Sequence, residues 1–300
     1  MHDHHDHAHH TSITNLKTVF FINLCFTVIE VVGGVLTGSI AIISDALHDL
    51  GDSVSLGFSW AFEKLSFKKR TARYTYGYKR FSLLGGLITA VMLIIGSVFV
   101  ISEAVKRIIE PVAVNATGMM GLAVLGLAVN TLAALRVRRG KKITERIVMI
   151  HLLEDVLGWA AVLVVSIIMQ FTYLPILDPL LSLCIAVFVL TKIYPQLKAT
   201  LNIFLQHAPL EFDITATKTQ INKIKHVRDV HDLHIWTLDG EYHVVTLHVV
   251  VTRGLPEQET AGIKTKVRSL LSGKGIDHIT VEIEWEDEEC LNCDTEEAHS

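Results

Sequence analysis

The stretch IAIISDALHDLGDSVSLGFSWAF, residues 40–62, is apolar at both ends and carries four ionisable side chains near its middle. These side chains belong to Asp45, His48, Asp49 and Asp52. On an α-helix they occupy positions i, i+3, i+4 and i+7, and therefore share one face. Ionisable groups inside a membrane are unfavourable and usually functional. The stretch therefore predicts a membrane-spanning helix with a polar, functional face.

Apolar segments long enough to cross about 30 Å of hydrocarbon recur along the chain. There are six of them: residues 16–37, 40–63, 81–104, 117–137, 147–170 and 176–195. Hydrophobic residues make up 50% of the chain and charged residues 19%, which is unusually apolar for a soluble protein. We therefore expect an α-helical membrane protein with six transmembrane helices over residues 15–200.

Basic residues are concentrated in two of the connecting loops, 64–80 and 136–142. The other loops between the apolar segments have almost none. Loops rich in Lys and Arg normally remain in the cytoplasm, so these two loops are expected there. With six spans, both termini of the chain are then cytoplasmic as well.

After residue 200 the composition becomes that of a soluble domain, which we assign to residues 201–287. A D-G hairpin signal joins two strand-like runs, and a helical run with a Pro start and a Gly stop follows them. The expected elements are a helix at 213–225, strands at 230–238 and 242–251, a helix at 256–273 and a strand at 278–285. This order, αββαβ, predicts a small α+β domain of open ferredoxin-like or metallochaperone-like form. A His-rich tail, 1–14, precedes the membrane segments, and an acidic tail, 288–300, ends the chain.

The fifth apolar segment repeats the H-x-x-x-D spacing of the second. The sequence HLLED places His151 and Asp155 one helical turn apart, as are His48 and Asp52. Two histidines and two carboxylates supply four ligands, a number and mixture that suit tetrahedral zinc. Calcium or magnesium would require six or more oxygens. We expect the four to form one shared metal site, in preference to two structural ion pairs.

Other polar residues in the apolar segments have less definite roles. Asp45 and Asp49 either line an access path to the metal or are simply solvated. Glu30, in the first segment, is a candidate for supporting the metal ligands or for a water path. Asn130, in the fourth, has the same alternatives, but a hydrogen bond between helices is favoured.

The pattern favours transport of a metal over catalysis with it. Four protein ligands saturate the metal, whereas catalytic zinc keeps a position open for water. There is no H-E-x-x-H motif and no nucleophile paired with a base. Because metal binding requires neutral histidine and ionised aspartate, it releases protons, which offers a basis for exchange of metal against H⁺.

These features together resemble the cation diffusion facilitator family. The resemblance covers nearly the whole chain and includes GSIAIISDALHDLGD, RYTYGYKR, SEAVKRIIEP and VHDLHIWTL. It implies a homodimer in the bacterial inner (plasma) membrane that exports Zn²⁺ from the cytoplasm in exchange for protons by alternating access. It also implies His48, Asp52, His151 and Asp155 as the transport site. A role with nucleic acid is not expected.

Three details refine the resemblance. Histidine at position 48, where some members have aspartate, is associated with a preference for zinc over cadmium. Some members bind a second metal through Asp and His in the loop at 64–80, but this loop has neither residue, so no metal is expected there. Members often carry Ser one turn beyond the span-five motif, where this chain has GWAA.

The resemblance also implies zinc in the cytoplasmic domain. His231, His248 and Glu284 fit the family pattern best, with Glu282 and Asp277 as further candidates. The alternative for His234 is a place in the core beside Trp236, and the alternative for any histidine on a strand is an ordinary surface position.

Cys290 and Cys293 form a C-x-x-C pair, half of a zinc site or a redox pair. Six histidines in the N-terminal MHDHHDHAHH could complete such a site across a dimer. The alternative is a loosely chelating tail.

Two other classes of function compete with transport. A membrane zinc sensor would use the cytoplasmic domain and would not need a buried four-ligand site. An intramembrane metalloenzyme would need a base and an open coordination position, which the sequence does not suggest. The ligand types also leave Cd²⁺, Co²⁺, Ni²⁺ and Mn²⁺ open as cargo.

Overall fold

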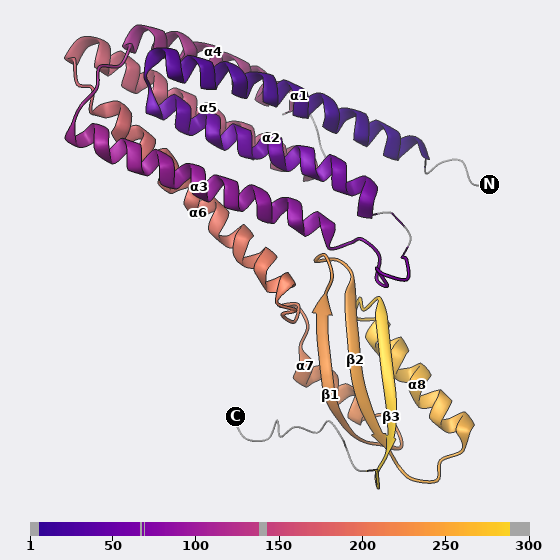
Figure 1. The fold of residues 1–300 in the computed structure, drawn as a ribbon. Helices are drawn as coiled ribbons and strands as arrows, with labels where there is room; N and C mark the ends of the chain where they lie inside the picture. The colour runs from indigo at the N-terminus through magenta and orange to yellow at the C-terminus, as the bar shows by residue number, and fades with distance from the viewer. Residues whose placement is uncertain (1–5, 67, 69, 138–142, 289–300) are drawn as a thin grey trace. The chain divides into compact units, whose positions relative to one another are not determined.

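The structure is a computed structural model that describes residues 6–66, 68, 70–137 and 143–288 (Figure 1). It divides into two compact units, Met1–Leu197 and Lys198–Ser300. This boundary lies three residues before the position at which the composition of the sequence changes.

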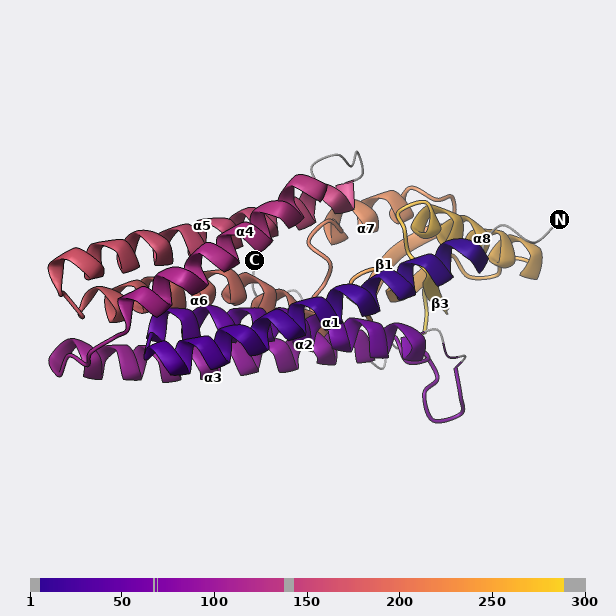
Figure 2. The ribbon, with the colours of Figure 1, turned by 90° about the horizontal axis from the view of Figure 1, so that it is seen from above.

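The first unit consists of long helices that run side by side (Figures 1 and 2). They are α1 (Asp6–Thr37), α2 (Ile40–Ser66), α3 (Phe81–Ile109), α4 (Ala116–Val137), α5 (Ile143–Thr172) and α6 (Leu177–Phe204), whose residues from Lys198 on belong to the second unit. Helices α3 to α6 are apolar and long enough to cross a membrane. Within the described residues, the apolar part of α1 is Asn23–Thr37, which is shorter than the apolar parts of α3 to α6. Helix α2 carries three aspartates on its polar face. Each predicted span coincides with one helix.

Apolar contacts hold these helices together. Helix α1 packs on α2 and α4, α2 packs on α3, α4 packs on α5, and α2 also touches α5. One cluster joins Ile42 of α2 and Met119 of α4 to Trp159 of α5, and all three side chains are fully buried. A second cluster joins Ala90 of α3 to Val189 and Ile193 of α6. These apolar clusters hold the helices together, and the polar face of α2 with Asp45 and Asp49 is directed into the unit.

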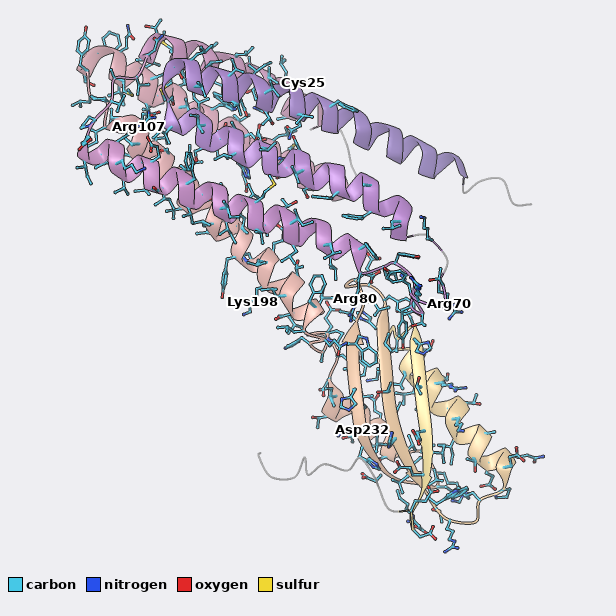
Figure 3. All side chains as sticks on the ribbon, in the orientation of Figure 1. Cys25, Arg70, Arg80, Arg107, Lys198 and Asp232 are labelled. Atoms are coloured by element: carbon cyan, nitrogen blue, oxygen red, sulfur yellow. The ribbon has the colours of Figure 1, made fainter. Side chains whose placement is uncertain are left out.

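The turn between α1 and α2 is fixed by two side chains from other helices. Gly38 has φ +72°, a conformation that glycine adopts without strain. Arg107 of α3, labelled in Figure 3, donates from Nη1 to the Gly38 carbonyl at 2.5 Å. The fully buried Asp178 of α6 accepts hydrogen bonds from the backbone N–H groups of Ile40 and Ala41. The first turn of α2 therefore has a defined position.

The second unit has the predicted αββαβ order. Its elements are α7 (Ile214–Asn222), β1 (Val227–Thr237), β2 (His243–Val251), α8 (Glu257–Ser272) and β3 (His278–Trp285). The strands form one sheet in the order β1-β2-β3, with β1 antiparallel and β3 parallel to β2. Inward-facing Val245, Leu247 and Val249 of β2 are buried in a core with Val267 and Leu271 of α8. The helices cover one face of the sheet, and the polar side chains lie on the other face.

Candidate metal sites

The polar faces of α2 and α5 meet at the two H-x-x-x-D pairs. Asp52 Oδ2 lies 3.8 Å from His48 Nε2 in its own helix and 3.2 Å from His151 Nε2 in α5. His151 Nε2 lies 3.8 Å from Asp155 Oδ2. Ligand atoms of His48, His151 and Asp155 all fall within 4.8 Å of one another. The structure therefore brings the four predicted side chains together around one point.

The chemistry of this set suits a borderline divalent metal. Two imidazole nitrogens and two carboxylates match the ligand number and types of tetrahedral zinc sites. His48 Nδ1 and Asp52 Oδ2 are buried and have no hydrogen-bond partner among the residues that the structure describes. Buried polar atoms of this kind are rare in native structures and call for a ligand or another explanation.

A cavity of about 280 Å³ reaches this set of side chains from the side of α6. It is lined by Asp45, His48 and Asp155 together with apolar residues of α6 such as Ile185 and Phe188. Glu154 also borders it, but its carboxylate is paired with Lys192 Nζ at 2.5 Å. The cavity therefore borders His48 and Asp155 directly.

The remaining intramembrane candidates are all buried. Asp45 and Asp49 are each 7% exposed, and Asp45 lines the cavity. Glu30 is 1% exposed and interacts electrostatically with Asp49, Asp45 and Asp155. Asn130 donates from Nδ2 to the Gly126 carbonyl of its own helix at 3.1 Å. This hydrogen bond lies within α4, and the favoured interhelical hydrogen bond of Asn130 stays a prediction.

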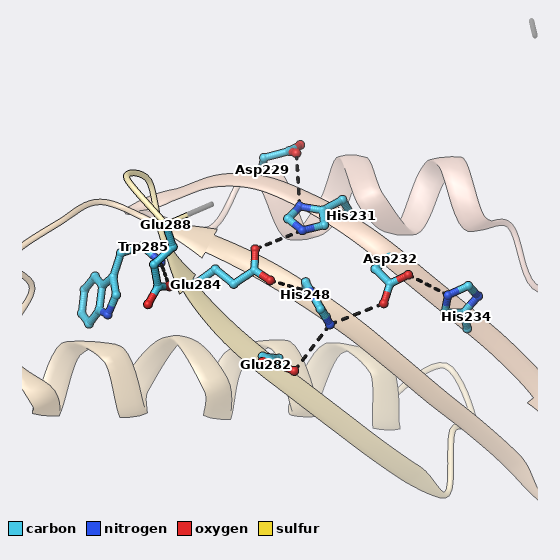
Figure 4. A network of polar contacts seen from close by, with 9 residues as sticks. All are labelled: Asp229, His231, Asp232, His234, His248, Glu282, Glu284, Trp285 and Glu288. Carbon is cyan, nitrogen blue, oxygen red and sulfur yellow. Dashed lines mark hydrogen bonds and ion pairs between the residues drawn. The ribbon is translucent and has the colours of Figure 1, made fainter. Parts of the chain in front are cut away.

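A second cluster lies on the face of the sheet in the second unit that its helices leave open (Figure 4). The register places His231 opposite His248, and the two rings lie 5.4 Å apart between centroids. Glu284 of β3 bridges them, with Oε2 3.0 Å from His231 Nε2 and Oε1 2.6 Å from His248 Nδ1. Their ligand atoms lie within 4.8 Å of one another. Two imidazoles and a carboxylate again provide a zinc-compatible set.

Asp232 joins this cluster although sequence reasoning missed it. A register irregularity between His231 and His234 interrupts the ladder, and Asp232 there has φ +47°. Its carboxylate contacts His248 Nε2 at 3.4 Å and His234 Nε2 at 2.7 Å (Figure 4). Strict alternation would place Asp232 on the face opposite His231. The only hint in the sequence is the aspartate between two histidines in VHDLH.

The other candidates of this domain have mixed outcomes. Glu282 reaches His248 Nε2 at 3.5 Å, so it borders the cluster. Asp277 instead accepts a hydrogen bond from the His243 backbone N–H and lies outside it. His234 has a side chain that is 63% exposed, so the alternative of a core position is wrong.

The cysteine hypothesis concerns a part of the chain that has no structural description. Cys290 and Cys293 lie outside the described residues. Of the N-terminal histidines, positions 1–5 are outside as well, while the backbone of α1 is described from Asp6. A metal role for the C-x-x-C pair stays a prediction.

Comparison with known proteins agrees with both units. Residues 16–205 match the cation efflux transmembrane domain, and residues 209–286 match the cytoplasmic domain of cation efflux proteins. The chain is 34% identical to the cadmium, cobalt and zinc/H(+)-K(+) antiporter of Bacillus velezensis, over 93% of this chain and 91% of the relative.

Two further relatives are each 31% identical to the chain. The zinc transporter ZitB of Escherichia coli is matched over 94% of this chain and 93% of its own length. The metal cation efflux system protein CzcD of Cupriavidus metallidurans is matched over 90% of this chain and 86% of its own length. The two domain matches and these near full-length similarities show that the chain belongs to the cation efflux family, the cation diffusion facilitators, and is a membrane transporter of metal cations, not an enzyme.

Proposed function

We propose that the chain exports Zn²⁺ from the cytoplasm in exchange for H⁺ by alternating access. The observation that carries this proposal is the convergence of His48, Asp52, His151 and Asp155 from two helices. The set contains two nitrogens and two carboxylates, which fits zinc better than a hard, all-oxygen cation. The names of relatives support the same cargo, since one is a zinc transporter and another carries cadmium, cobalt and zinc.

Proton exchange follows from the chemistry of the ligands. Zinc binds neutral imidazole and ionised carboxylate, so protons and zinc compete for the same atoms. Protons entering from the outside would displace the metal, and the emptied site would return to the cytoplasm carrying protons. The Bacillus relative is named for exchange against H⁺ and K⁺, which is consistent with a cation as the counter-substrate.

The proposed setting is the bacterial inner membrane with both termini in the cytoplasm. The basic loop after α2 supports this orientation through the positive-inside rule. The second unit would then lie in the cytoplasm, in agreement with the family domain that it matches. We further propose that this unit forms the homodimer and that His231, His248 and Glu284 hold a resident zinc ion.

A zinc-flux assay tests the transport proposal. The full chain is reconstituted in vesicles that contain a zinc-sensitive dye, and a pH gradient is imposed. We expect zinc flux that follows the gradient and is lost in Asp155→Ala. The matched control is Glu110→Gln, which neutralises an exposed carboxylate just after α3 and should retain the flux.

The outcomes separate the alternatives. Flux that ignores the pH gradient would contradict antiport with protons. If vesicles bind zinc but show no flux with any gradient, the membrane sensor becomes the better hypothesis. Parallel assays with Cd²⁺, Co²⁺, Ni²⁺ and Mn²⁺ rank the possible cargo ions, and a faster flux of one of these would replace zinc as the principal substrate.

A further inference from the structure

An ion pair between α5 and α6 lies at the edge of the cavity beside the proposed transport site. Glu154 of α5 lines this cavity, and its Oε1 accepts a hydrogen bond from Lys192 Nζ of α6 at 2.5 Å. Glu154 directly precedes Asp155, a member of the zinc set, and the two carboxylates interact electrostatically. The carboxylate next to the zinc set is therefore held by a lysine.

This ion pair lies apart from the apolar packing between the two helices. Leu181 and Ile185 of α6 pack against the buried cluster that contains Trp159 of α5. Lys192 lies about two turns further along α6 than Ile185. Its side chain is 52% exposed and that of Glu154 is 28% exposed. Partly exposed ion pairs contribute little to stability, so the packing of α5 on α6 does not explain why the pair is present.

Lys192 has a second favourable position near the pair. Its Nζ lies 5.2 Å from the centroid of the Phe188 ring, one turn back on the same helix. The face of an aromatic ring attracts a cation, and Phe188 itself lines the cavity. Lysine side chains near the end of a membrane helix also extend toward water. The ammonium group can therefore leave Glu154 and still be stabilised.

The direction of the two helices places the pair on the proposed cytoplasmic side of the cavity, so the inference rests on the proposed function. Helix α5 begins after the basic loop 136–142, and α6 continues into the second unit. Both the loop and the second unit are cytoplasmic in the proposed orientation. Lys192 lies one turn, about 6 Å, beyond the cavity-lining Phe188 toward that side. Zinc that enters the cavity from the cytoplasm along α6 therefore meets the pair.

We propose that Glu154 and Lys192 form an entrance gate for zinc on the cytoplasmic side of the transport site. Glu154 offers an arriving zinc ion its first carboxylate oxygen, and Lys192 competes with the ion for this oxygen. When Zn²⁺ displaces the ammonium group, Lys192 turns to Phe188 and to water, and zinc passes to the adjacent Asp155. The competition favours a divalent ion over a monovalent one, because at equal distance the carboxylate attracts it twice as strongly.

Opposite effects of two substitutions test this proposal. Initial rates of zinc flux are measured in vesicles over a range of zinc concentrations on the side of the second unit, under a fixed pH gradient. We expect Glu154→Gln to raise the half-saturating zinc concentration about tenfold and Lys192→Gln to lower it by a similar factor, the lower end of the range for electrostatic steering. The matched control is Lys198→Gln, which removes the same charge from an exposed position further along α6 and should leave this concentration unchanged.

An exchange of the two charges separates a gate from a purely structural ion pair. The double variant of Glu154→Lys with Lys192→Glu keeps an ion pair between the helices but places the cation on the cavity wall. We expect its half-saturating zinc concentration to stay raised, as in Glu154→Gln. A structural pair would be restored by the exchange, and its loss in the two single variants would act in the same direction.

The outcomes distinguish the gate from the transport site. Shifts in the same direction for the two single variants, no shift in either, or a native value for the exchanged pair would overturn the proposal. If Asp155→Ala loses flux but the variants of Glu154 and Lys192 behave as the native chain does, the gate is wrong and the zinc set stands. If Asp155→Ala keeps native flux while the two single variants shift in opposite directions, the gate stands and Asp155 is not a zinc ligand.

Discussion

Replacement of Asp178 by asparagine tests how firmly the first turn of α2 is held. Asp178 is completely buried at the start of α6. Its Oδ1 accepts from Ser39 Oγ at 2.5 Å and from the Ala41 N–H at 3.3 Å, and its Oδ2 accepts from the Ile40 N–H at 2.8 Å. A carboxylate at this place also interacts favourably with the positive end of the α2 dipole. Three donors from one helix start thus depend on a single side chain.

The expected loss of stability follows from these contacts. Asparagine keeps one acceptor oxygen but directs an NH₂ group at a donor that Asp178 now satisfies. A hydrogen bond to a charged group contributes about 1.5–3 kcal/mol net, and the remaining bonds would lose their charge assistance. We therefore expect a destabilisation of about 2–4 kcal/mol. For a chain of this size, that corresponds to a fall of about 5–15 °C in the unfolding midpoint.

The assay is thermal unfolding of the purified full chain in detergent, followed as the fraction that stays monodisperse. Glu110→Gln serves as the control, because this carboxylate is exposed just after α3. A midpoint for Asp178→Asn within about 1 °C of that control, less than half a kcal/mol, would refute the reasoning. It would mean that water or another group replaces the lost acceptor at no net cost.

Two more substitutions test the helix packing and the cluster of His231, His248 and Glu284 on the sheet. Gly126→Ala would place a Cβ 2.3 Å from ring atoms of the buried Trp159, so we expect a loss of about 1–3 kcal/mol by the same thermal assay. Gly121→Ala, on the same helix but with no atom within 4 Å of the added Cβ, should be neutral or slightly stabilising, and an equal effect of both would contradict the packing argument. Glu284→Gln should lower the zinc bound per chain and reduce the thermal stabilisation by zinc, which is about 2.7 kcal/mol at a hundredfold excess over Kd. Glu286→Gln, two residues along the chain, should leave both unchanged, and a native-like zinc content in Glu284→Gln would exclude this carboxylate as a ligand.

The helices were predictable because apolar length and helix length largely coincide in a membrane. The differences occur where a helix continues beyond its most apolar part. Helix α3 ends at Ile109, beyond the predicted end at residue 104. The segment SEAVKRII is helical although it is less apolar than the part of α3 before it. Helix α6 continues through Pro195 to Phe204, beyond the predicted end at 195. Hydropathy marks the part of a helix that lies in lipid, whereas the backbone hydrogen bonds that define its end do not depend on lipid.

The spacing of the candidate ligands was readable for a similar reason. An i, i+4 pair on one helix must share a face, so each H-x-x-x-D motif could be recognised by itself. Which helices meet is a tertiary property, and the convergence of α2 with α5 was inferred from the chemical similarity of their motifs. Asp232 escaped because its place depends on a register irregularity, which strand periodicity cannot predict.

The proposed metal site between α2 and α5 and the cluster on the sheet differ in how firmly their parts are joined. This difference supports the separate roles that we propose for them. His48 and Asp52 lie on α2, which packs mainly on α1 and α3, while His151 and Asp155 lie on α5, which packs mainly on α4. In the proposed alternating-access cycle the two halves of this set would separate, which requires the cluster of Ile42, Met119 and Trp159 that also joins α2 to α5 to rearrange. His231, His248 and Glu284 lie on three neighbouring strands of one sheet, which backbone hydrogen bonds hold together on both sides of the irregularity after His231. Separating them would break the sheet, so a metal bound there is expected to be retained while zinc at the helix pair is released.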